Sequence, residues 1–407
     1  MYGGAHLFTA DTSARLGAAA IRAMKEYAPD AATLAAALGL SETTAGRIYG
    51  RVQEKLRREP VEDFRLDFED GYGNRPDVEE DGHAESAARE VASAARTGTL
   101  PPFIGIRIKN VGDELRERAL RTAEIFLRRL LADRNGEVPE NFVVTLPKIT
   151  ARAQIRVLAD ALASIESSHS LNRGALKMEL MIETPESIFD ERGAVSLPGL
   201  LDEGGGRIVA AHFGTYDYTA SLGITAAHQH MRHPACDFAR SVMQVTLSGR
   251  GLWLSDGATN VLPVPVHRGG GLPPTPEQAA ENRAAVHRAW RLHYEDIRHS
   301  LTNAFYQGWD LHPAQLVTRY AAVYAFFLES LEAASERLLN LIAKAAQATL
   351  LGDVFDDAAT GQGLLNLFLR ALNCGAVREH EIGALTGLTI DELRSGSFVT
   401  IVKGRRA

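Results

Sequence analysis

Two acidic residues stand at the ends of two separate apolar segments. Glu183 ends the segment of residues 177–183 (KMELMIE), and Asp217 ends the segment of residues 208–217 (IVAAHFGTYD). Carboxylate oxygens are the ligands that Mg²⁺ and Mn²⁺ prefer, whereas zinc favours nitrogen and sulfur. A cation held by two carboxylates keeps open positions for water and for a chelating substrate such as a 2-oxo acid. We therefore expect the fold to bring Glu183 and Asp217 to one divalent metal ion, Mg²⁺ or Mn²⁺.

Short strand-like segments alternate with helical sequence along most of the chain. Eight of them are centred near residues 6, 66, 105, 144, 180, 210, 253 and 310. Eight βα units over roughly 300 residues are typical of a TIM (β/α)8 barrel. A doubly wound open sheet is the alternative, but no glycine-rich dinucleotide fingerprint follows any of these segments. The sequence thus predicts an α/β fold of the TIM-barrel type, with its first strand over residues 6–10.

Helical sequence outside the eight units predicts two additions to the barrel. Residues 30–60 lack a strand pattern and include Ser41, a residue type that caps helix N-termini. Strand patterning also ends after residue 314, where apolar residues begin to recur at helical spacing. We expect a catalytic barrel over residues 1–315 with a helical insertion near residues 30–60, followed by a helical extension over residues 316–407.

The C-terminal ends of the expected strands carry many charged residues. In a TIM barrel these ends form the active face. Arg107 is a planar, permanently charged donor that suits a substrate carboxylate or an enolate oxygen. The alternative is that Arg107 supports the barrel through ion pairs with acidic neighbours, and Lys148 has the same alternative. The residues at the other strand ends are Glu69, Asp70, Asp256 and His312.

Histidines near Asp217 suggest a second, weaker site. His228, His230 and His233 lie within six residues of one another. They could bind zinc or line the barrel mouth, but no neighbouring carboxylate or cysteine pattern supports zinc. His212 precedes Asp217 inside the same strand, where a buried, hydrogen-bonded histidine is expected.

The composition excludes several classes of function. The chain has 407 residues, a net charge of -7 and a pI near 6.0, so it has no basic excess for binding nucleic acid. Its two cysteines, Cys236 and Cys374, form no CxxC pair and fit a reducing compartment. No apolar stretch reaches the roughly 18 residues of a membrane helix. We expect a cytoplasmic protein without membrane contact.

Seven short motifs between residues 66 and 315 follow the order found in one known superfamily. The chain resembles the citrate lyase β-subunit and HpcH/HpaI aldolase superfamily. Each motif is weak alone, but their common order is specific. The motifs cover residues 66–70 (LDFED), 106–110 (IRIKN), 146–148 (LPK), 182–184 (IET), 213–217 (FGTYD), 237–241 (DFARS) and 311–315 (LHPAQ).

The resemblance implies a Mg²⁺-dependent lyase or aldolase that makes or breaks a carbon–carbon bond through the enolate of a short 2-oxo acid or related carboxylate. Glu183 and Asp217 would be the metal ligands. Glu69 and Asp70 would orient metal-bound waters, and Arg107 would face the substrate.

The same motifs imply where the substrate binds. Backbone N–H groups around Tyr216 and Asp217 would receive the substrate carboxylate. The expected substrate contacts, besides Arg107, are Gly214, Thr215, Tyr216 and His312. A homo-oligomer is expected by resemblance alone.

Departures from the superfamily pattern affect the substrate and the base. Members that act on coenzyme A thioesters carry a C-terminal lid with a DGxMvDxP-like segment, which this chain lacks, and the acidic residues 352–357 resemble a helix linker. A small free 2-oxo acid is thus at least as plausible as a CoA thioester. The aldolase branch often uses a histidine base after its first acidic strand, where this chain has Gly71 and Tyr72. The general base is therefore unassigned.

Two other functions stay open at this stage. One is phosphoryl transfer or hydrolysis with phosphoenolpyruvate or pyruvate on the same barrel, for which only residues 268–271 (RGGG) offer a phosphate cradle. The other is a non-catalytic oligomeric binding protein, although a charge cluster is costly to keep without a use.

Overall fold

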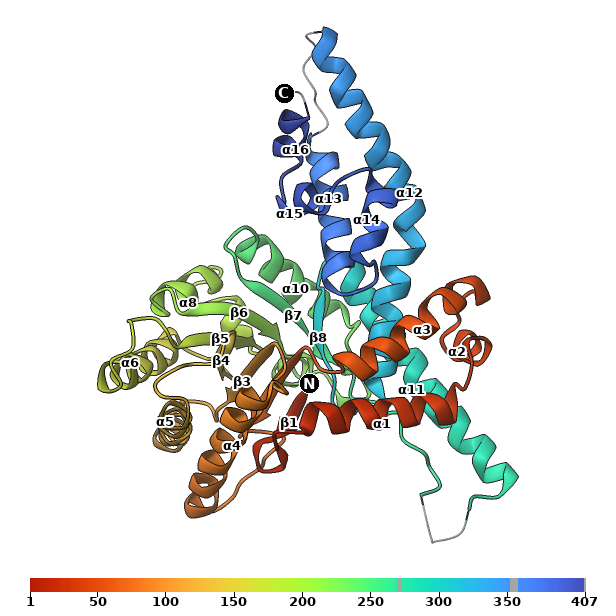
Figure 1. The fold of residues 1–407 in the computed structure, drawn as a ribbon. Helices are drawn as coiled ribbons and strands as arrows, with labels where there is room; N and C mark the ends of the chain where they lie inside the picture. The colour runs from red at the N-terminus through yellow and green to blue at the C-terminus, as the bar shows by residue number, and fades with distance from the viewer. Residues whose placement is uncertain (269–272, 352–357, 406–407) are drawn as a thin grey trace.

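The computed structural model describes residues 1–268, 273–351 and 358–405. Eight parallel strands form one sheet in the order β1 to β8 (Figure 1). A backbone hydrogen bond of 3.3 Å from Tyr2 N to Asp310 O links β1 to the segment after β8. The expected TIM barrel is confirmed. The strands are β1 Tyr2–Gly4, β2 Asp63–Asp67, β3 Phe103–Arg107, β4 Phe142–Leu146, β5 Lys177–Ile182, β6 Ile208–Phe213, β7 Trp253–Ala258 and β8 Gln307–Trp309.

Alternation along β2 separates the barrel interior from the helical layer. Arg65 points inward, where its Nε donates to Glu179 Oε2 of β5 at 3.0 Å and its guanidinium lies 5.1 Å from the centre of the Trp309 ring. Phe68 points outward, and its ring lies 6.4 Å from that of Phe126 in the surrounding helices. The period of two in a strand thus places every second residue of β2 inside the barrel. The interior is held by buried ion pairs as well as by apolar contacts.

Helices cover the outside of the barrel and include the predicted insertion. Asp30 caps α2, where its carboxylate accepts from Thr33 N at 2.7 Å, and Ser41 caps α3 by accepting from Thr44 N at 3.1 Å. The helical insertion near residues 30–60 is therefore present as α2 and α3. The helices before α12 are α1 Thr12–Tyr27, α2 Ala31–Leu38, α3 Glu42–Arg58, α4 Asp77–Thr97, α5 Arg116–Asp133, α6 Arg152–Ser168, α7 Pro185–Ile188, α8 Leu197–Glu203, α9 Thr215–Ser221, α10 Pro234–Leu247 and α11 Pro276–Thr302, with short 3₁₀ helices η1 Ala5–Leu7 and η2 Ala226–His228.

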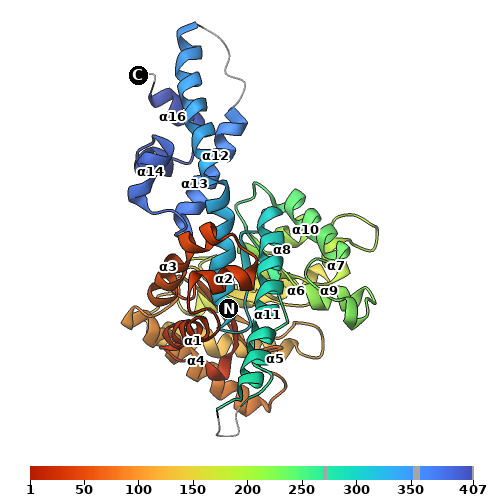
Figure 2. The ribbon, with the colours of Figure 1, turned by 90° about the vertical axis from the view of Figure 1, so that its right-hand side faces the viewer.

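The C-terminal extension rises from the end of the barrel opposite the strand C-termini. Helix α12 begins just after β8, packs on α11 and α3, and continues to contact α13, α14 and α16. At about 1.5 Å per residue, its 37 residues span about 55 Å. Figures 1 and 2 show this helix running out of the barrel and carrying the extension. The elements are α12 Gln315–Leu351, α13 Ala358–Asn373, α14 Glu379–Thr386, α15 Ile390–Arg394 and α16 Phe398–Gly404.

The first strand lies earlier than predicted. It covers Tyr2–Gly4, and residues 5–7 form η1, so the prediction of a strand over residues 6–10 is wrong. A Cβ on Gly3 would lie 2.8 Å from the Phe64 ring, and one on Gly4 would lie 2.7 Å from Gly71 O. Only glycine allows this close approach, and its lack of a side chain hides the strand from a hydrophobic pattern.

Two segments discussed from the sequence lie partly or wholly outside the residues that the structure describes. The acidic residues 352–357 and residues 269–271 of the possible phosphate cradle lie outside the described residues. Among the helices of the described ranges, none is both long and apolar enough to cross a lipid bilayer.

Candidate active site at the barrel mouth

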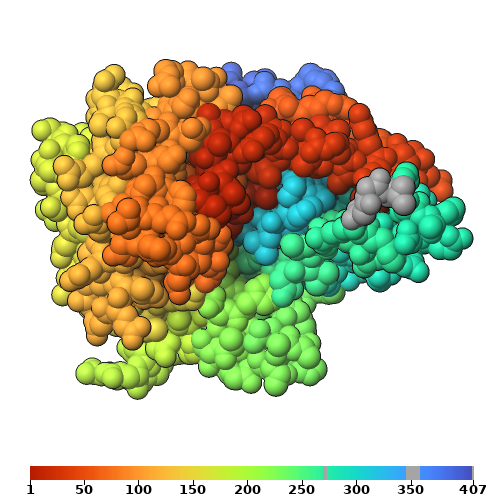
Figure 3. Space-filling model, turned by 90° about the horizontal axis from the view of Figure 1, so that it is seen from below, coloured from red at the N-terminus to blue at the C-terminus, as the bar shows by residue number. Residues whose placement is uncertain are grey.

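The C-terminal ends of neighbouring strands bring the predicted acidic residues to one end of the barrel. Arg107 pairs in register with Asp67 of β2, Glu183 directly follows β5, and Gly214 directly follows β6. Figure 3 views this end, where N-terminal, green and teal segments surround a hollowed centre. The geometry therefore concentrates the candidate chemistry at the mouth.

Glu183 is a buried carboxylate with one free oxygen. It is 1% exposed, and its Oε1 accepts from Lys148 N at 2.7 Å, while its buried Oε2 has no hydrogen-bond partner in the part of the chain that the structure describes. Burial, and secondly the charge of Asp217, raise the pKa of Glu183 to about 8. A Cβ on Gly214 would overlap Oε2. Gly214 thus leaves the space that the free oxygen needs.

Asp217 lies in the first turn of α9 and keeps access to solvent. Its side chain is 40% exposed, and its Oδ1 lies 3.7 Å from Lys148 Nζ. Its charge acts on the buried Glu183 carboxyl. The structure therefore brings the two predicted ligands to the same side of the mouth.

Lys148 is the cation at the centre of this group. Its Nζ donates to Glu69 Oε1 and, at 2.9 Å, to Asp70 Oδ1, and its backbone has a left-handed φ of 50°. Burial lowers the pKa of Lys148, but the carboxylates around it, Glu69 first, outweigh burial and raise it. The alternative of a salt-bridging Lys148 is confirmed. Its amide and its ammonium together tie the β4 loop to four acidic residues.

Arg107 is fixed by a carboxylate that the sequence reasoning missed. Its Nε and Nη2 donate to the two oxygens of Asp67 at 2.8 and 2.5 Å. Its Nη1 lies 3.2 Å from Glu69 Oε2 and 3.5 Å from Asp70 Oδ2. The face of the Tyr2 ring covers the guanidinium at 4.6 Å. Arg107 therefore does form the expected ion pairs with acidic neighbours. The same contacts hold its Nη1 toward Glu69 and Asp70, which we call the acidic rim.

Glu69 and Asp70 differ in environment although they are adjacent. Glu69 is 9% exposed, and its buried Oε2 makes an ion pair with Arg107 but no hydrogen bond to any described residue. Burial raises the pKa of Glu69. Asp70 is 55% exposed at its side chain, and Arg107 and Lys148 outweigh its burial and lower its pKa. Their role in orienting water stays a prediction.

The donor set fits a hydrated Mg²⁺ or Mn²⁺ ion better than an all-protein metal cage. Within the described residues, no group of three or more His, Cys, Asp or Glu side chains is arranged to hold a metal. Mg²⁺ is usually bound by one or two carboxylates and completes its shell with water and substrate. The unpaired Oε2 of Glu183, beside the accessible Asp217, matches that arrangement.

A family model described as a domain of unknown function, DUF6986, matches residues 1–401. The chain belongs to the DUF6986 family. A search among curated proteins found no match for this DUF6986 chain.

Solved structures resemble this DUF6986 protein in fold. A citrate lyase from Burkholderia xenovorans has 18% identity and a TM-score of 0.55, over 83% of this chain and 91% of the other. A malate synthase from Haloferax volcanii has 16% identity and a TM-score of 0.46, over 90% and 94%. The protein CitE from Mycobacterium tuberculosis, in complex with magnesium and acetate, has 17% identity and a TM-score of 0.37, over 65% and 82%. The expected likeness to the citrate lyase group is thus confirmed at the level of the fold.

Only some polar groups of the predicted substrate contacts after β6 are available to a substrate. Tyr216 Oη donates to Ala258 O and accepts from Asn260 N, both at 3.0 Å, so this side chain anchors the β7 loop. Gly214 N donates to Ile182 O at 3.0 Å and is therefore not available to a substrate. In the described part of the DUF6986 chain, the N–H groups of Thr215 and Tyr216 have no acceptor.

His312 and Asp256 are not part of the acidic group. His312 Nδ1 accepts from Ala314 N at 3.2 Å, and burial, with the charge of Arg268, lowers its pKa. Its role in substrate binding stays a prediction. Asp256 is fully buried and accepts from Arg240 at 2.8 Å and from Ser300 at 2.6 Å. The placement of Asp256 on the active rim is therefore wrong, because its side chain points to the helical layer.

The histidines after Asp217 are not arranged with other described residues as a group that could hold a metal. His233 caps α10 by accepting from Ala235 N at 3.1 Å, and the His230 ring only packs against it at 5.7 Å. His212 is buried as predicted, with its Nδ1 3.2 Å from Tyr2 Oη.

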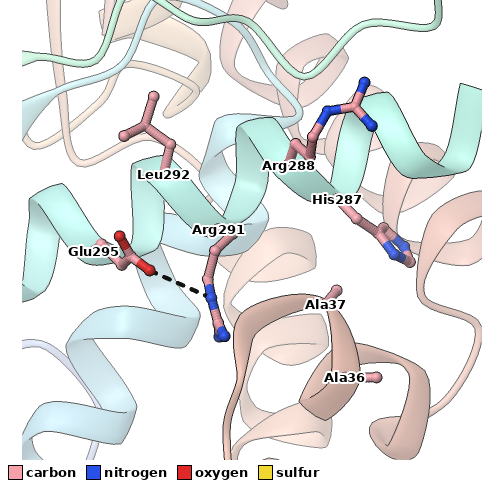
Figure 4. A pocket seen from close by; sticks show the side chains of 7 residues that line it. All are labelled: Ala36, Ala37, His287, Arg288, Arg291, Leu292 and Glu295. Carbon is pink, nitrogen blue, oxygen red and sulfur yellow. Dashed lines mark ion pairs between the residues drawn. The ribbon is translucent and has the colours of Figure 1, made fainter.

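Another hollow lies away from the mouth, and two of its polar side chains are already paired. It has a volume of about 350 Å³ and lies between α2 and α11 (Figure 4). His287 bonds to Tyr27 O at 2.7 Å, and Arg291 pairs with Glu295 at 3.3 Å. Figure 4 shows Arg288 extending away from the α2 alanines. The grouped carboxylates and cations make the barrel mouth, not this hollow, the candidate site of this DUF6986 protein.

Proposed function

We propose that this protein is a Mg²⁺-dependent lyase or aldolase that makes or breaks a carbon–carbon bond through the enolate of a short 2-oxo acid or related carboxylate. The observation that carries the proposal is the buried Glu183, whose Oε2 has no hydrogen-bond partner among the described residues and whose pKa is raised to about 8 by burial and by the charge of Asp217. A buried carboxylate in this state is stabilised by a cation. The order of motifs and the fold shared with a citrate lyase support the choice of reaction.

Glu183 and Asp217 would hold the cation, which would supply polarisation of the 2-oxo group of the substrate. Arg107 directs its Nη1 to the acidic rim, where it would oppose negative charge that develops on the substrate oxygen. Asp67 fixes the guanidinium through two hydrogen bonds, so little reorganisation is needed during the reaction. The free N–H groups of Thr215 and Tyr216 would receive the substrate carboxylate.

Lys148 would neutralise part of the acidic rim. Its ammonium contacts Glu69 and Asp70 and lies 3.7 Å from Asp217. It would thereby keep these carboxylates ionised around the site and limit the number that compete for the cation.

A free 2-oxo acid is the preferred substrate class, and a CoA thioester is less favoured. The extension rises from the end of the barrel away from the mouth (Figure 1), so α13 to α16 do not cover the mouth of their own chain. A small substrate does not need such a cover to be held by the groups described above.

The first experiment is a thermal shift measurement with Mg²⁺ and with EDTA. We expect Mg²⁺ to raise the melting temperature of the wild type and of Glu186→Ala, an exposed control three residues from the site. Glu183→Ala and Asp217→Ala should lose the response. An equal response in all four proteins would reject the metal assignment.

The second experiment tests the reaction. Short 2-oxo acids are incubated with Mg²⁺, alone and with aldehydes or an acyl-CoA, and bond cleavage or formation is followed by mass spectrometry. Product formation that depends on Glu183 supports the lyase or aldolase. Phosphate release from phosphoenolpyruvate without any carbon–carbon chemistry would favour the phosphoryl-transfer alternative, and no turnover would favour a binding protein.

A further inference from the structure

A second cavity lies at the end of the barrel opposite the mouth. Its volume is about 300 Å³, and it is enclosed by α3 of the insertion, α12, and the segment from the end of α13 to the start of α14, with one residue of α15. It therefore lies where the insertion meets the extension. The lining residues are Arg51, Glu54, Lys55, Arg58, Tyr324, Leu372, Asn373, Gly375, Val377, Arg378, Glu379 and Arg394.

Most cations in the cavity wall already have a carboxylate partner. Arg51 pairs with Glu381 at 2.7 Å, Arg378 pairs with Glu54 at 2.6 Å, and Arg394 pairs with Glu379. The remaining paired cation, Lys55, contacts two carboxylates, Glu59 and Glu62, each at 2.5 Å. These pairs build the wall and leave little charge for a ligand.

Arg58 is the exception. It lies at the end of α3, is exposed, and has neither an ion pair nor a hydrogen bond within the described ranges of the chain. The other arginines of the wall each have a carboxylate partner, so Arg58 is the lining arginine of the described residues whose guanidinium stays available to a ligand. A guanidinium that has no carboxylate partner of its own is suited to bind an oxyanion through its forked N–H groups.

Tyr324 supplies an independent second donor. It is 2% exposed, yet its hydroxyl has no hydrogen-bond partner among the residues that the structure describes. Burial raises the pKa of Tyr324, so the hydroxyl keeps its proton and can donate it. Tyr324 lines the cavity, so a hydroxyl without a protein partner can donate to a ligand oxygen there.

Gly375 lies next to both the Tyr324 hydroxyl and the Arg58 guanidinium. A Cβ on Gly375 would lie 3.4 Å from Tyr324 Oη and 4.0 Å from Arg58 Nη2. Its φ of 84° is left-handed, so the chain turns here without a side chain that would fill the gap. The hydroxyl, the guanidinium and the open face of Gly375 therefore line one compartment.

We propose that this cavity is a binding site for a small oxyanion, a phosphate or carboxylate group of a metabolite, held by the Arg58 guanidinium and the Tyr324 hydroxyl. The two donors come from different parts of the chain, Arg58 from the insertion and Tyr324 from the helix that carries the extension. A bound oxyanion links these parts. The site is distant from the mouth, and its occupation is independent of the proposed reaction.

The test is a titration of the metal-free protein with sodium phosphate and, separately, with sodium malonate, at ionic strength matched with sodium chloride. Binding is measured by calorimetry and as a saturable rise in melting temperature. Arg58→Ala and Tyr324→Phe should weaken binding by about tenfold or more, because each removes one donor to a charged group. Arg57→Ala is the matched control, because Arg57 is an exposed neighbour whose guanidinium, among the described residues, bonds only to Gln53.

Each outcome decides the proposal. Saturable binding of phosphate, of malonate or of both, weakened in Arg58→Ala and Tyr324→Phe but kept in Arg57→Ala, supports it and identifies the oxyanion class. Equal binding in all variants places the anion elsewhere, including the mouth, and overturns it. The absence of saturable binding in the wild type also overturns it. Tyr324→Phe retains the packing of the ring, so its result does not depend on a loss of folding.

Discussion

Replacing Glu183 by glutamine should stabilise the metal-free protein at neutral pH and abolish its response to Mg²⁺. Glu183 is 1% exposed, and no described residue forms a hydrogen bond with its Oε2. The charged form is therefore poorly solvated when no cation is bound. Glutamine keeps the size of the side chain and its bond from Lys148 N but carries no charge.

The size of the effect follows from the pKa. The carboxyl has a folded-state pKa of about 8 against an ordinary value of 4.5. Because the folded pKa is raised, the folded protein holds the proton more tightly, so stability is highest below pH 4.5 and falls as the pH rises toward about 8. The full loss of unfolding free energy between these two pKa values is about 5 kcal/mol, and about 3 kcal/mol of it has already been lost at pH 7. Relaxation and water entry reduce the observed effect to about 1–3 kcal/mol.

The assay compares melting temperatures in EDTA between pH 5 and pH 8.5. With an unfolding entropy of about 2.1 cal/mol/K per residue, 1 kcal/mol corresponds to about 1.2 °C for a chain of this length. The melting temperature of Glu183→Gln should thus exceed that of the wild type by about 1–4 °C near pH 8, and the difference should shrink toward pH 5. Glu186→Gln, at an exposed position, is the control and should follow the wild type at every pH.

Addition of Mg²⁺ should reverse the order of stability. The wild type gains stability by mass action, and the gain should grow with pH because the cation displaces the proton from Glu183. Glu183→Gln should gain nothing. The reasoning is refuted when Glu183→Gln is less stable than the wild type in EDTA at pH 8, or when both proteins respond equally to Mg²⁺.

Three further variants test the geometry of the mouth. Arg107→Lys should lower kcat by at least about 100-fold in a steady-state assay, because lysine does not reproduce the bidentate, fixed donor; a loss confined to KM would contradict this. Gly214→Ala should weaken Mg²⁺ binding by about tenfold or more in calorimetry, since its Cβ would overlap Glu183 Oε2. Gly46→Ala, where a Cβ would meet nothing within 4 Å, should bind as the wild type does. Tyr216→Phe should lower the free energy of unfolding by about 1–2 kcal/mol through loss of its two hydrogen bonds but keep the Mg²⁺ response, and loss of that response would give the hydroxyl a direct role.

The spacing of strands and helices was sufficient to predict the barrel. Alternation of apolar segments with helical sequence is a local property, and the barrel follows from it because eight such units pack in sequence order. The first strand was missed because Gly3 and Gly4 have no side chains to register in a hydrophobic pattern. Their role depends on contacts with Phe64 and Gly71, which are distant in sequence.

The charged residues at the barrel mouth could be predicted in part. Glu183, Asp217 and Arg107 were found from their positions at strand ends. Asp67, the main partner of Arg107, was missed although alternation along β2 placed it on the inner face. The inward direction of a strand residue is readable from its neighbours. The partner that it meets across the barrel depends on tertiary packing.

Helix α12 belongs to the barrel wall and to the extension at the same time. Its first part packs on α11 and α3, and its later part packs on α13, α14 and α16. A deletion after residue 315 would remove the helix that covers the last strand, so the barrel would lose part of its own wall together with the extension. Shortened versions of the protein should therefore end beyond the part of α12 that packs on α11 and α3. For the same reason, a force applied to the extension would be transmitted along α12 to β8, the last strand of the barrel.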